Sequence, residues 1–183
     1  MQRCFWCNLK NPKYIEYHDK EWGIENFDDD YIFQMLILES FQAGLSWECV
    51  LNKRENFRVA FDNFDYKKIA QYDENKIATL AADAGIIRNK QKISAAVNNA
   101  KVYIDLLCEC GSFRNYLNKF WDGAVIYDNV SVTSELSDSI AKDLKKRGMK
   151  FLGSTVIQSF LQAIGVINAH NDNCFLYVDK KNS

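Results

Sequence analysis

The chain has 183 residues, of which 48% are hydrophobic and 14% aromatic, and its formal net charge at pH 7 is -1. That length fits one domain or two small lobes with a shared core. The near-zero charge excludes recognition of nucleic acid through a global positive field, so any such partner would be bound by local basic patches. The aromatic content suits either a large aromatic core or a pocket for a flat ligand.

Cysteine usage and the N-terminus indicate a cellular compartment. Six cysteines at irregular spacings do not resemble the disulfide framework of a small secreted protein. The opening MQRCFWCNLK has no apolar core of a signal peptide, and no apolar run approaches the length of a membrane span. We therefore expect a cytoplasmic protein with reduced thiols and no membrane contact.

The predicted elements of the N-terminal half are helices. Residues 30–43 are apolar on nearly every side, which is typical of a buried helix. Ser46 has the position of an N-cap before apolar residues that continue at helical spacing to residue 61. Asp73 is placed to cap a helix that stops at Gly85, and the clearest apolar stripe starts near Asn89 and reaches residue 107.

The C-terminal half also reads as helical. Three helices are predicted there, with these bounds: Ser112 to Phe120, Ser137 to Gly148, and Ser154 or Thr155 to Ile164. The only stretch with strand character, residues 126–136, is interpreted as a loop, and residues 179–183 are expected to be frayed. The predicted class is therefore all-α, without repeats or linkers.

The segment LKKRGMKFLGSTVIQSF joins two of these helices through a short turn between Gly148 and Gly153. The free N–H groups of the helix that begins at Ser154 would form an anion site. Around it lie Lys145, Lys146, Arg147 and Lys150, with only Asp143 opposing them. One interpretation is a helix-hairpin-helix aimed at a phosphate, and the other is an ordinary αα-turn with a solvated basic face. A weaker basic loop occupies residues 85–92.

Candidate metal ligands lie near both ends of the chain. Cys4 and Cys7 form a CxxC pair, His18 follows, and His170 and Cys174 are four residues apart. A structural zinc takes four nitrogen or sulfur ligands, so five candidates are one more than needed. The alternative is a pair of core histidines with buried free thiols. A catalytic Cys–His pair has no supporting motif.

Six motifs in order resemble those of the DNA-3-methyladenine glycosylase I family. They are RCFW, YIEYHDKEWG, LESFQAGLSW, VLNKRENFRVAF, DAGIIRNKQKI and LKKRGMKFLGSTVIQSFLQAIGVINAH. The fourth departs from the family pattern in having Asn52 inside it. The resemblance runs from Arg3 to about Cys174 and is weakest over residues 108–136.

The resemblance implies an all-helical fold of the helix-hairpin-helix glycosylase superfamily. Residues 1–183 would form one unit, with two helical lobes around a DNA-facing cleft and a structural Zn²⁺ joining the N- and C-terminal segments. The implied zinc ligands are Cys4, His18, His170 and Cys174. Cys7 lies where the family requires no ligand, but its closeness leaves the choice between Cys4 and Cys7 open.

The resemblance also implies a base pocket. Its residues would be Trp6, Tyr14, Tyr17, Trp22, Glu39 and Trp47. An adenine methylated at N3 is a cation, and electron-rich rings attract and stack on such a ligand. Glu39 lies on an otherwise apolar helix, where a carboxylate is costly without a partner. As the catalytic residue it would accept hydrogen bonds from the base and offset its charge. The alternative is an exposed position or a structural ion pair.

The implied reaction is hydrolytic removal of 3-methyladenine from alkylated double-stranded DNA, which requires the nucleotide to flip into the pocket. Free 3-methyladenine and an abasic site would be the products. Gly44 and Leu45 would lie at the DNA surface, with Leu45 filling the gap in the base stack. The competing interpretation places Leu45 in the core.

The expected enzyme is a monofunctional monomer. Many relatives in the superfamily carry an Asp after the hairpin helix, and the segment GVINAH has none. No motif positions a lysine for Schiff-base chemistry, so water would be the acceptor, with no redox cofactor and no magnesium. Two alternatives remain open: a non-catalytic module that binds damaged DNA, and a zinc-stabilised helical protein that does not touch DNA.

Overall fold

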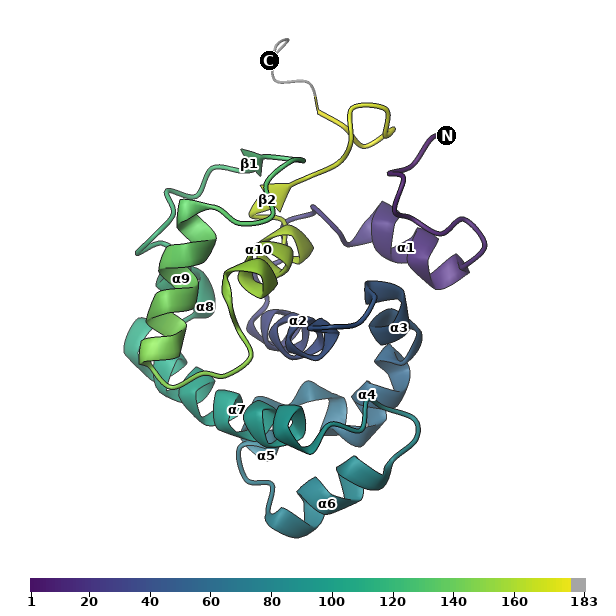
Figure 1. The fold of residues 1–183 in the computed structure, drawn as a ribbon. Helices are drawn as coiled ribbons and strands as arrows, with labels where there is room; N and C mark the ends of the chain where they lie inside the picture. The colour runs from purple at the N-terminus through teal and green to yellow at the C-terminus, as the bar shows by residue number, and fades with distance from the viewer. Residues whose placement is uncertain (179–183) are drawn as a thin grey trace.

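Helix α2 (Asp29–Gln42) lies at the centre of the molecule, with the other helices arranged around it (Figure 1). In this computed structural model, which describes residues 1–178, every residue of α2 from Ile32 to Phe41 is buried. Its first turn is capped by Asp28, whose side chain accepts a hydrogen bond from the Tyr31 amide. The predicted buried helix is confirmed to within one residue at each end. The expected fraying of residues 179–183 falls outside the described residues.

The described residues form ten α-helices, one 3₁₀ helix and two short strands, so the predicted all-α class is confirmed in outline. The elements besides α2 are α1 (Pro12–Lys20), α3 (Trp47–Asn52), α4 (Arg54–Ala60), η1 (Asp62–Phe64), α5 (Tyr66–Ile69), α6 (Glu74–Ala82), α7 (Lys90–Cys110), α8 (Phe113–Leu117), β1 (Ile126–Tyr127), α9 (Glu135–Lys146), α10 (Ser154–Ala163) and β2 (Ile167–Asn168). No helix in this part of the chain is long and apolar enough to cross a membrane.

Local capping explains why several helices begin where the sequence predicts. Ser46, Asp73, Asn89 and Ser112 each accept a hydrogen bond from the backbone amide three residues ahead. Such a cap satisfies one of the free donors at a helix start and is typically worth about 1 kcal/mol. Because this interaction is local, it can be read from sequence.

Two predicted helices end early or break. The helix expected from Ser46 to residue 61 is two helices, with Lys53 between them at φ -96° and ψ 0°. The Lys53 ammonium donates to the carbonyls of Ala84 and Gly85 and holds the break against that loop. The helix capped by Asp73 ends at Ala82 rather than at Gly85, because the Asp83 side chain accepts from the Gly85 amide and competes with helical bonding.

Three other expectations need correction. The helix after Ser112 ends at Leu117, short of Phe120. The helix placed at Ser137 begins two residues earlier, because Ser134 is the N-cap and Ser137 completes a reciprocal capping box with it. The stretch interpreted wholly as a loop contains β1, which pairs in parallel with β2, with Ile126 opposite Ile167.

Contacts with the end of α10 fix the position of the segment that follows α1. Gly165 has a φ of +79°, and a Cβ there would lie 2.2 Å from the backbone of Ile24 and Glu25. This close approach admits only glycine. The amide of Gly23 donates to the Gln162 carbonyl at 2.9 Å. Residues 23–25 are therefore fixed against α10, which holds the adjoining Trp22 at the same place.

Candidate active site and metal centre

A cavity of about 180 Å³ opens between α1, α2, α3 and α10. All six side chains predicted for a base pocket line it, together with three that the sequence did not single out. The nine lining residues are Trp6, Tyr14, Tyr17, Trp22, Glu39, Gln42, Trp47, Ser159 and Gln162. The three additions lie at helical spacing, since Gln42 is one turn after Glu39 and Gln162 is one turn after Ser159.

The aromatic side chains form two contacting groups. The rings of Trp6 and Trp22 are 4.6 Å apart and nearly perpendicular, and Trp6 also contacts Tyr14 at 5.4 Å. In the other group, the ring centres of Tyr17 and Trp47 are 5.1 Å apart. All but the half-buried Trp6 are buried. Such walls offer π-faces to a flat and positively charged ligand.

Helix α1 supplies two of these rings. Asn11 caps it by accepting from the Lys13 amide, and Pro12 occupies its first position, where proline is favoured. Tyr14, Tyr17 and His18 then share one buried face at helical spacing. Helix α1 is not among the elements predicted from the sequence, although the three-and-four spacing of its buried residues is present there.

Glu39 is buried in the wall of the cavity, with 3% of the residue exposed. Its Oε2 has no hydrogen-bond partner among the described residues, and no ion pair to it is formed there. Desolvation raises the pKa of its carboxyl to about 8, which favours the protonated form at neutral pH. The alternatives of an exposed position and a structural ion pair are therefore wrong.

A second unpartnered polar atom lines the same cavity. Trp47 Nε1 is buried and donates to no acceptor in the described chain. Buried polar atoms without a partner are rare in folded proteins and each one calls for an explanation. A donor on Trp47 and an acceptor on Glu39, both facing aromatic walls, fit a ligand that has both kinds of polar group.

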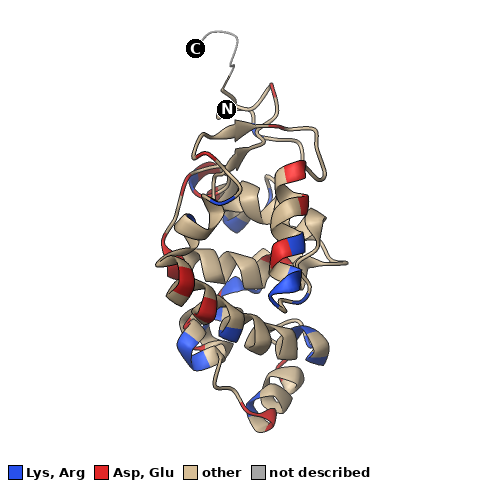
Figure 2. Ribbon diagram, turned by 90° about the vertical axis from the view of Figure 1, so that its left-hand side faces the viewer, with Lys and Arg blue, Asp and Glu red and all other residues tan. Residues whose placement is uncertain are grey.

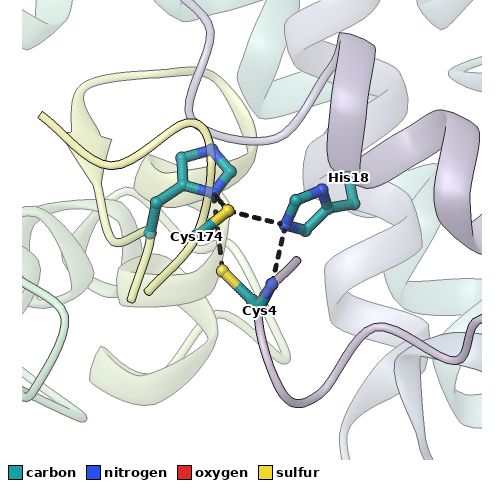
Figure 3. Close-up of side chains that lie close together, drawn as sticks. Cys4, His18 and Cys174 are labelled. Atoms are coloured by element: carbon teal, nitrogen blue, oxygen red, sulfur yellow. Dashed lines mark hydrogen bonds between the residues drawn. The ribbon is translucent and has the colours of Figure 1, made fainter. Parts of the chain in front are cut away.

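The metal ligands predicted from the chain ends meet in one buried cluster beside this cavity. The ligand atoms of Cys4, His18, His170 and Cys174 all lie within 4.8 Å of one another. Cys174 Sγ is 3.5 Å from His18 Nε2 and 3.5 Å from His170 Nδ1 (Figure 3). Cys7 is not a member, since its thiol donates to the Tyr14 carbonyl. Two sulfurs and two nitrogens form a set that could hold a metal ion.

Outer contacts orient both histidines of the cluster. His18 Nδ1 is 2.8 Å from an Asp19 oxygen, and Arg3 donates two hydrogen bonds to the same carboxylate. Those bonds lower the pKa of Asp19 to about 2, so it stays ionised and fixes the His18 tautomer in which Nε2 carries no proton. That nitrogen accepts a hydrogen bond from the Cys4 amide at 3.2 Å. His170 Nε2 lies 3.3 Å from the Trp22 carbonyl.

The cluster and the cavity share a wall. The rings of Trp22 and His170 are 4.7 Å apart, and those of Trp6 and His18 are 5.3 Å apart. Trp6 lies in a segment without helical structure, two residues after Cys4. Trp6 therefore lies between the cluster and the cavity, in contact with residues of both.

The loop after α2 is exposed. Gly44 has a φ of +82°, and Leu45 keeps 44% of its surface exposed. The interpretation of Leu45 as a core residue is therefore wrong. A leucine displayed on a glycine turn beside the cavity fits the wedge interpretation.

The turn between α9 and α10 presents a mixed set of charges. Lys146 and Lys150 are exposed, and Gly153 begins α10 without any side-chain cap. Arg147 is different, because its guanidinium donates to Asp143 on α9 and to Glu109 on α7. Both signs of charge are spread along the whole molecule (Figure 2), in keeping with the net charge of -1.

An aromatic cavity with a buried acid, set among helices, has the chemistry to hold a flat, cationic ring. Comparison with known proteins identifies the family: the model of the family described as methyladenine glycosylase matches residues 6–177. DNA-3-methyladenine glycosylase 1 of Escherichia coli (strain K12) is 40% identical over 187 residues, covering 99% of this chain and 100% of the relative. The chain belongs to the methyladenine glycosylase family.

Solved structures agree with this assignment. A crystal structure of 3-methyladenine DNA glycosylase I is similar with a TM-score of 0.92 at 40% identity, covering 97% of this chain and 100% of that one. The enzyme from Staphylococcus aureus, in a structure described as the basis of its 3-methyladenine recognition, gives a TM-score of 0.88 at 33% identity and covers 94% and 96% of the two chains.

Proposed function

We propose that this protein is a DNA repair glycosylase that removes 3-methyladenine from alkylated double-stranded DNA by hydrolysis. The family membership and the names of the relatives support this activity. The observation that links this activity to particular residues is the unpartnered carboxyl oxygen of Glu39 in an aromatic cavity. Free 3-methyladenine and an abasic site are the products.

The proposed chemistry needs little acid–base help from the protein. A 3-methyladenine nucleotide carries a positive charge, which already makes the base a good leaving group. The rings stack on the flipped base, and the cation favours the ionised form of Glu39, which then accepts hydrogen bonds from it. No lysine lines the cavity in the described chain, so water rather than an amine attacks C1′ of the sugar. Glu39 is the catalytic residue in this scheme.

We propose that the cluster of Cys4, His18, His170 and Cys174 binds one structural Zn²⁺. The donor set, its complete burial and the Asp19 contact to His18 support zinc. Bound zinc joins the N- and C-terminal segments. It thereby helps to position Trp6 and Trp22, the two tryptophans of the shared wall. It takes no part in the bond cleavage.

The DNA contacts are proposed to come from two loops. Leu45, displayed by Gly44, fills the gap left by the flipped nucleotide. The turn after α9 acts as a helix-hairpin-helix, in which Gly153 and Ser154 present free amides to a phosphate, with Lys146 and Lys150 beside them. Arg147, which the sequence placed in this group, is occupied by two carboxylates and positions the turn. The unit spanning 1–183 with two lobes, the monomeric state and the cytoplasmic location stay predictions.

Incubation of the protein with methylated DNA, followed by chromatography of the released bases, tests the activity. The expected result is free 3-methyladenine with an equal number of abasic sites. Binding to damaged duplex without base release would contradict the proposal and favour a non-catalytic damage-binding module. Failure to bind duplex at any salt concentration would favour a helical protein that does not touch DNA.

Replacing both Lys146 and Lys150 by alanine is expected to weaken binding to damaged and undamaged duplex alike. Each lost phosphate contact should reduce the slope of log affinity against log salt by about 0.9. Titrations at several salt concentrations measure this. The matched control replaces two exposed lysines elsewhere, Lys101 and Lys142, with the same charge change. Equal slopes for the two double variants would show that the hairpin is not the anchor.

A further inference from the structure

Helix α7 contacts both loops that are proposed to meet DNA, although it contributes nothing to the base cavity. Figure 1 shows it passing beneath α2 and beside the turn between α9 and α10. Two of its buried polar side chains reach these loops, and they are seven residues apart, on the same face. At 1.5 Å per residue, that spacing is roughly 10 Å along the helix.

The first is Lys92, a lysine with only 6% of its surface exposed. Its ammonium donates to the carbonyls of Phe41 at 2.9 Å and Ala43 at 2.7 Å. These carbonyls belong to the end of α2, where helical partners are missing and the helix dipole is negative. Lys92 therefore holds the start of the Gly44–Leu45 loop.

Burying an ammonium is costly, so its presence here needs a reason. A neutral cap would satisfy one or two carbonyls, but it would leave the negative end of α2 directed at the DNA surface. The Lys92 charge cancels that dipole where phosphates would approach. The buried cation thus makes the end of α2 compatible with a polyanion.

The second is Asn99, 3% exposed. Its Nδ2 donates to the Lys150 carbonyl at 2.9 Å, and its Oδ1 accepts from the Lys150 amide at 2.8 Å. The neighbouring Asn98 donates to the Gly148 carbonyl at 2.7 Å. The proposed phosphate anchor is therefore fixed to α7 through its backbone, which leaves the lysine side chains free.

We propose that α7 is a spacer that sets the distance between the Leu45 wedge and the phosphate anchor, with Lys92 and Asn99 as positioning residues for base flipping. A groove of about 470 Å³ runs along α7 beside Lys150 and Phe151, with Lys90 and Lys150 exposed at its edge. That groove leaves room for the DNA strand between the Leu45 wedge and the phosphate anchor. This inference rests on the proposed function, because a flipping step is required for it to matter.

The test separates flipping from base binding. Lys92→Met should reduce single-turnover release of 3-methyladenine from duplex about ten- to fiftyfold, and it should reduce the fluorescence gain of 2-aminopurine placed beside the lesion. Affinity for free 3-methyladenine should stay within twofold, because the cavity does not include Lys92. Lys101→Met, an exposed lysine of α7 outside the groove, is the matched control and should behave as the wild type.

Two further variants cover the case in which Lys92→Met does not fold. Lys92→Arg keeps a buried cation and should show a smaller loss of about two- to fivefold, again without change in free-base affinity. Asn99→Ala should lower both duplex affinity and the flipping signal, and its effect on rate should not add to that of Lys92→Arg if the two act as one spacer.

Wild-type rates and flipping signals in folded Lys92 and Asn99 variants would overturn the inference. So would a parallel fall in free-base affinity, since that would indicate a general loss of cavity structure. Failure of the proposed function is seen separately. In that case the wild-type protein releases no base, while free-base affinity and 2-aminopurine fluorescence still report on the two sites.

Discussion

Replacing Glu39 by glutamine is expected to lower single-turnover release of 3-methyladenine by about ten- to a hundredfold. Glutamine keeps the shape of the side chain but removes its charge and turns one acceptor oxygen into a donor. A charge-assisted hydrogen bond is worth roughly 1.5–3 kcal/mol, and a factor of ten in rate corresponds to about 1.4 kcal/mol. Rapid-quench assays with excess enzyme measure the effect. A Gln variant that released the base at the wild-type rate would refute the role of Glu39.

The same substitution has a pH signature. Because burial raises the pKa of Glu39 to about 8, the carboxylate that pairs with the cationic base becomes more abundant in the free enzyme as pH rises to that value. Wild-type kcat/KM should therefore increase up to about pH 8 and then level, whereas the Gln variant should lack this rise. The ratio of the two should be largest near pH 8. A constant ratio from pH 6 to 8 would contradict ionisation of Glu39.

Stability should change in the opposite direction from activity. Burial in the folded state raises the Glu39 pKa from its ordinary value of 4.5, so the stability linked to this group is complete below about pH 4.5 and is lost as pH rises through about 8. The Gln variant has no such loss. Its free energy of unfolding should exceed that of the wild type at pH 8 by a few kcal/mol, about 1.4 kcal/mol per unit of pKa shift at most. Denaturant titrations at pH 5 and 8 measure this.

Replacing His170 by alanine is expected to abolish tight metal binding and to destabilise the whole protein. At a structural zinc site, binding energy is folding energy, so losing one of four ligands should cost on the order of 5 kcal/mol. For a chain of this size that corresponds to a fall in Tm of about 10–20 °C. Elemental analysis of protein purified without added metal should give one zinc per wild-type chain.

The matched control for this variant is Cys7→Ser, which changes a buried thiol close to the cluster but outside it. It should retain one zinc and nearly the wild-type Tm. Full occupancy and unchanged melting of the His170 variant would eliminate the four-ligand site. Zinc loss in the Cys7 variant with retention in a Cys4→Ser variant would instead move the ligand to Cys7.

Much of the fold was predictable because its determinants are local. In the caps of α6 and α7, a side chain accepts a hydrogen bond from the backbone amide three residues later. The burial of α2 is evident from its apolar composition. Two of the features that were missed depend on distant partners. Lys53 ends α3 by donating hydrogen bonds to the carbonyls of residues 84 and 85. Strand β1 exists because it pairs with β2, which lies about forty residues further along the chain.

The same division applies to the site. The six predicted cavity residues carried a motif signature and an unusual residue type, such as an acid on an apolar helix. Ser159 and Gln162 join them only because α10 packs against α2, and neither residue is unusual for a helix. Arg147 looked like a phosphate ligand because its partner Glu109 lies 38 residues earlier in the chain.

The cluster beside the cavity has a consequence for biosynthesis. Cys4 meets Cys174 only after almost the entire chain has left the ribosome, and Trp6 has no helix of its own to hold it. Trp6 is thus among the first cavity side chains to be made, whereas the cluster beside it is complete only once Cys174 has been added. A nascent chain that already displays α1, α2 and α3 still lacks a closed cavity. A chain terminated before α10 would lack Ser159 and Gln162 of the cavity wall, and one terminated before Cys174 would lack a member of the cluster.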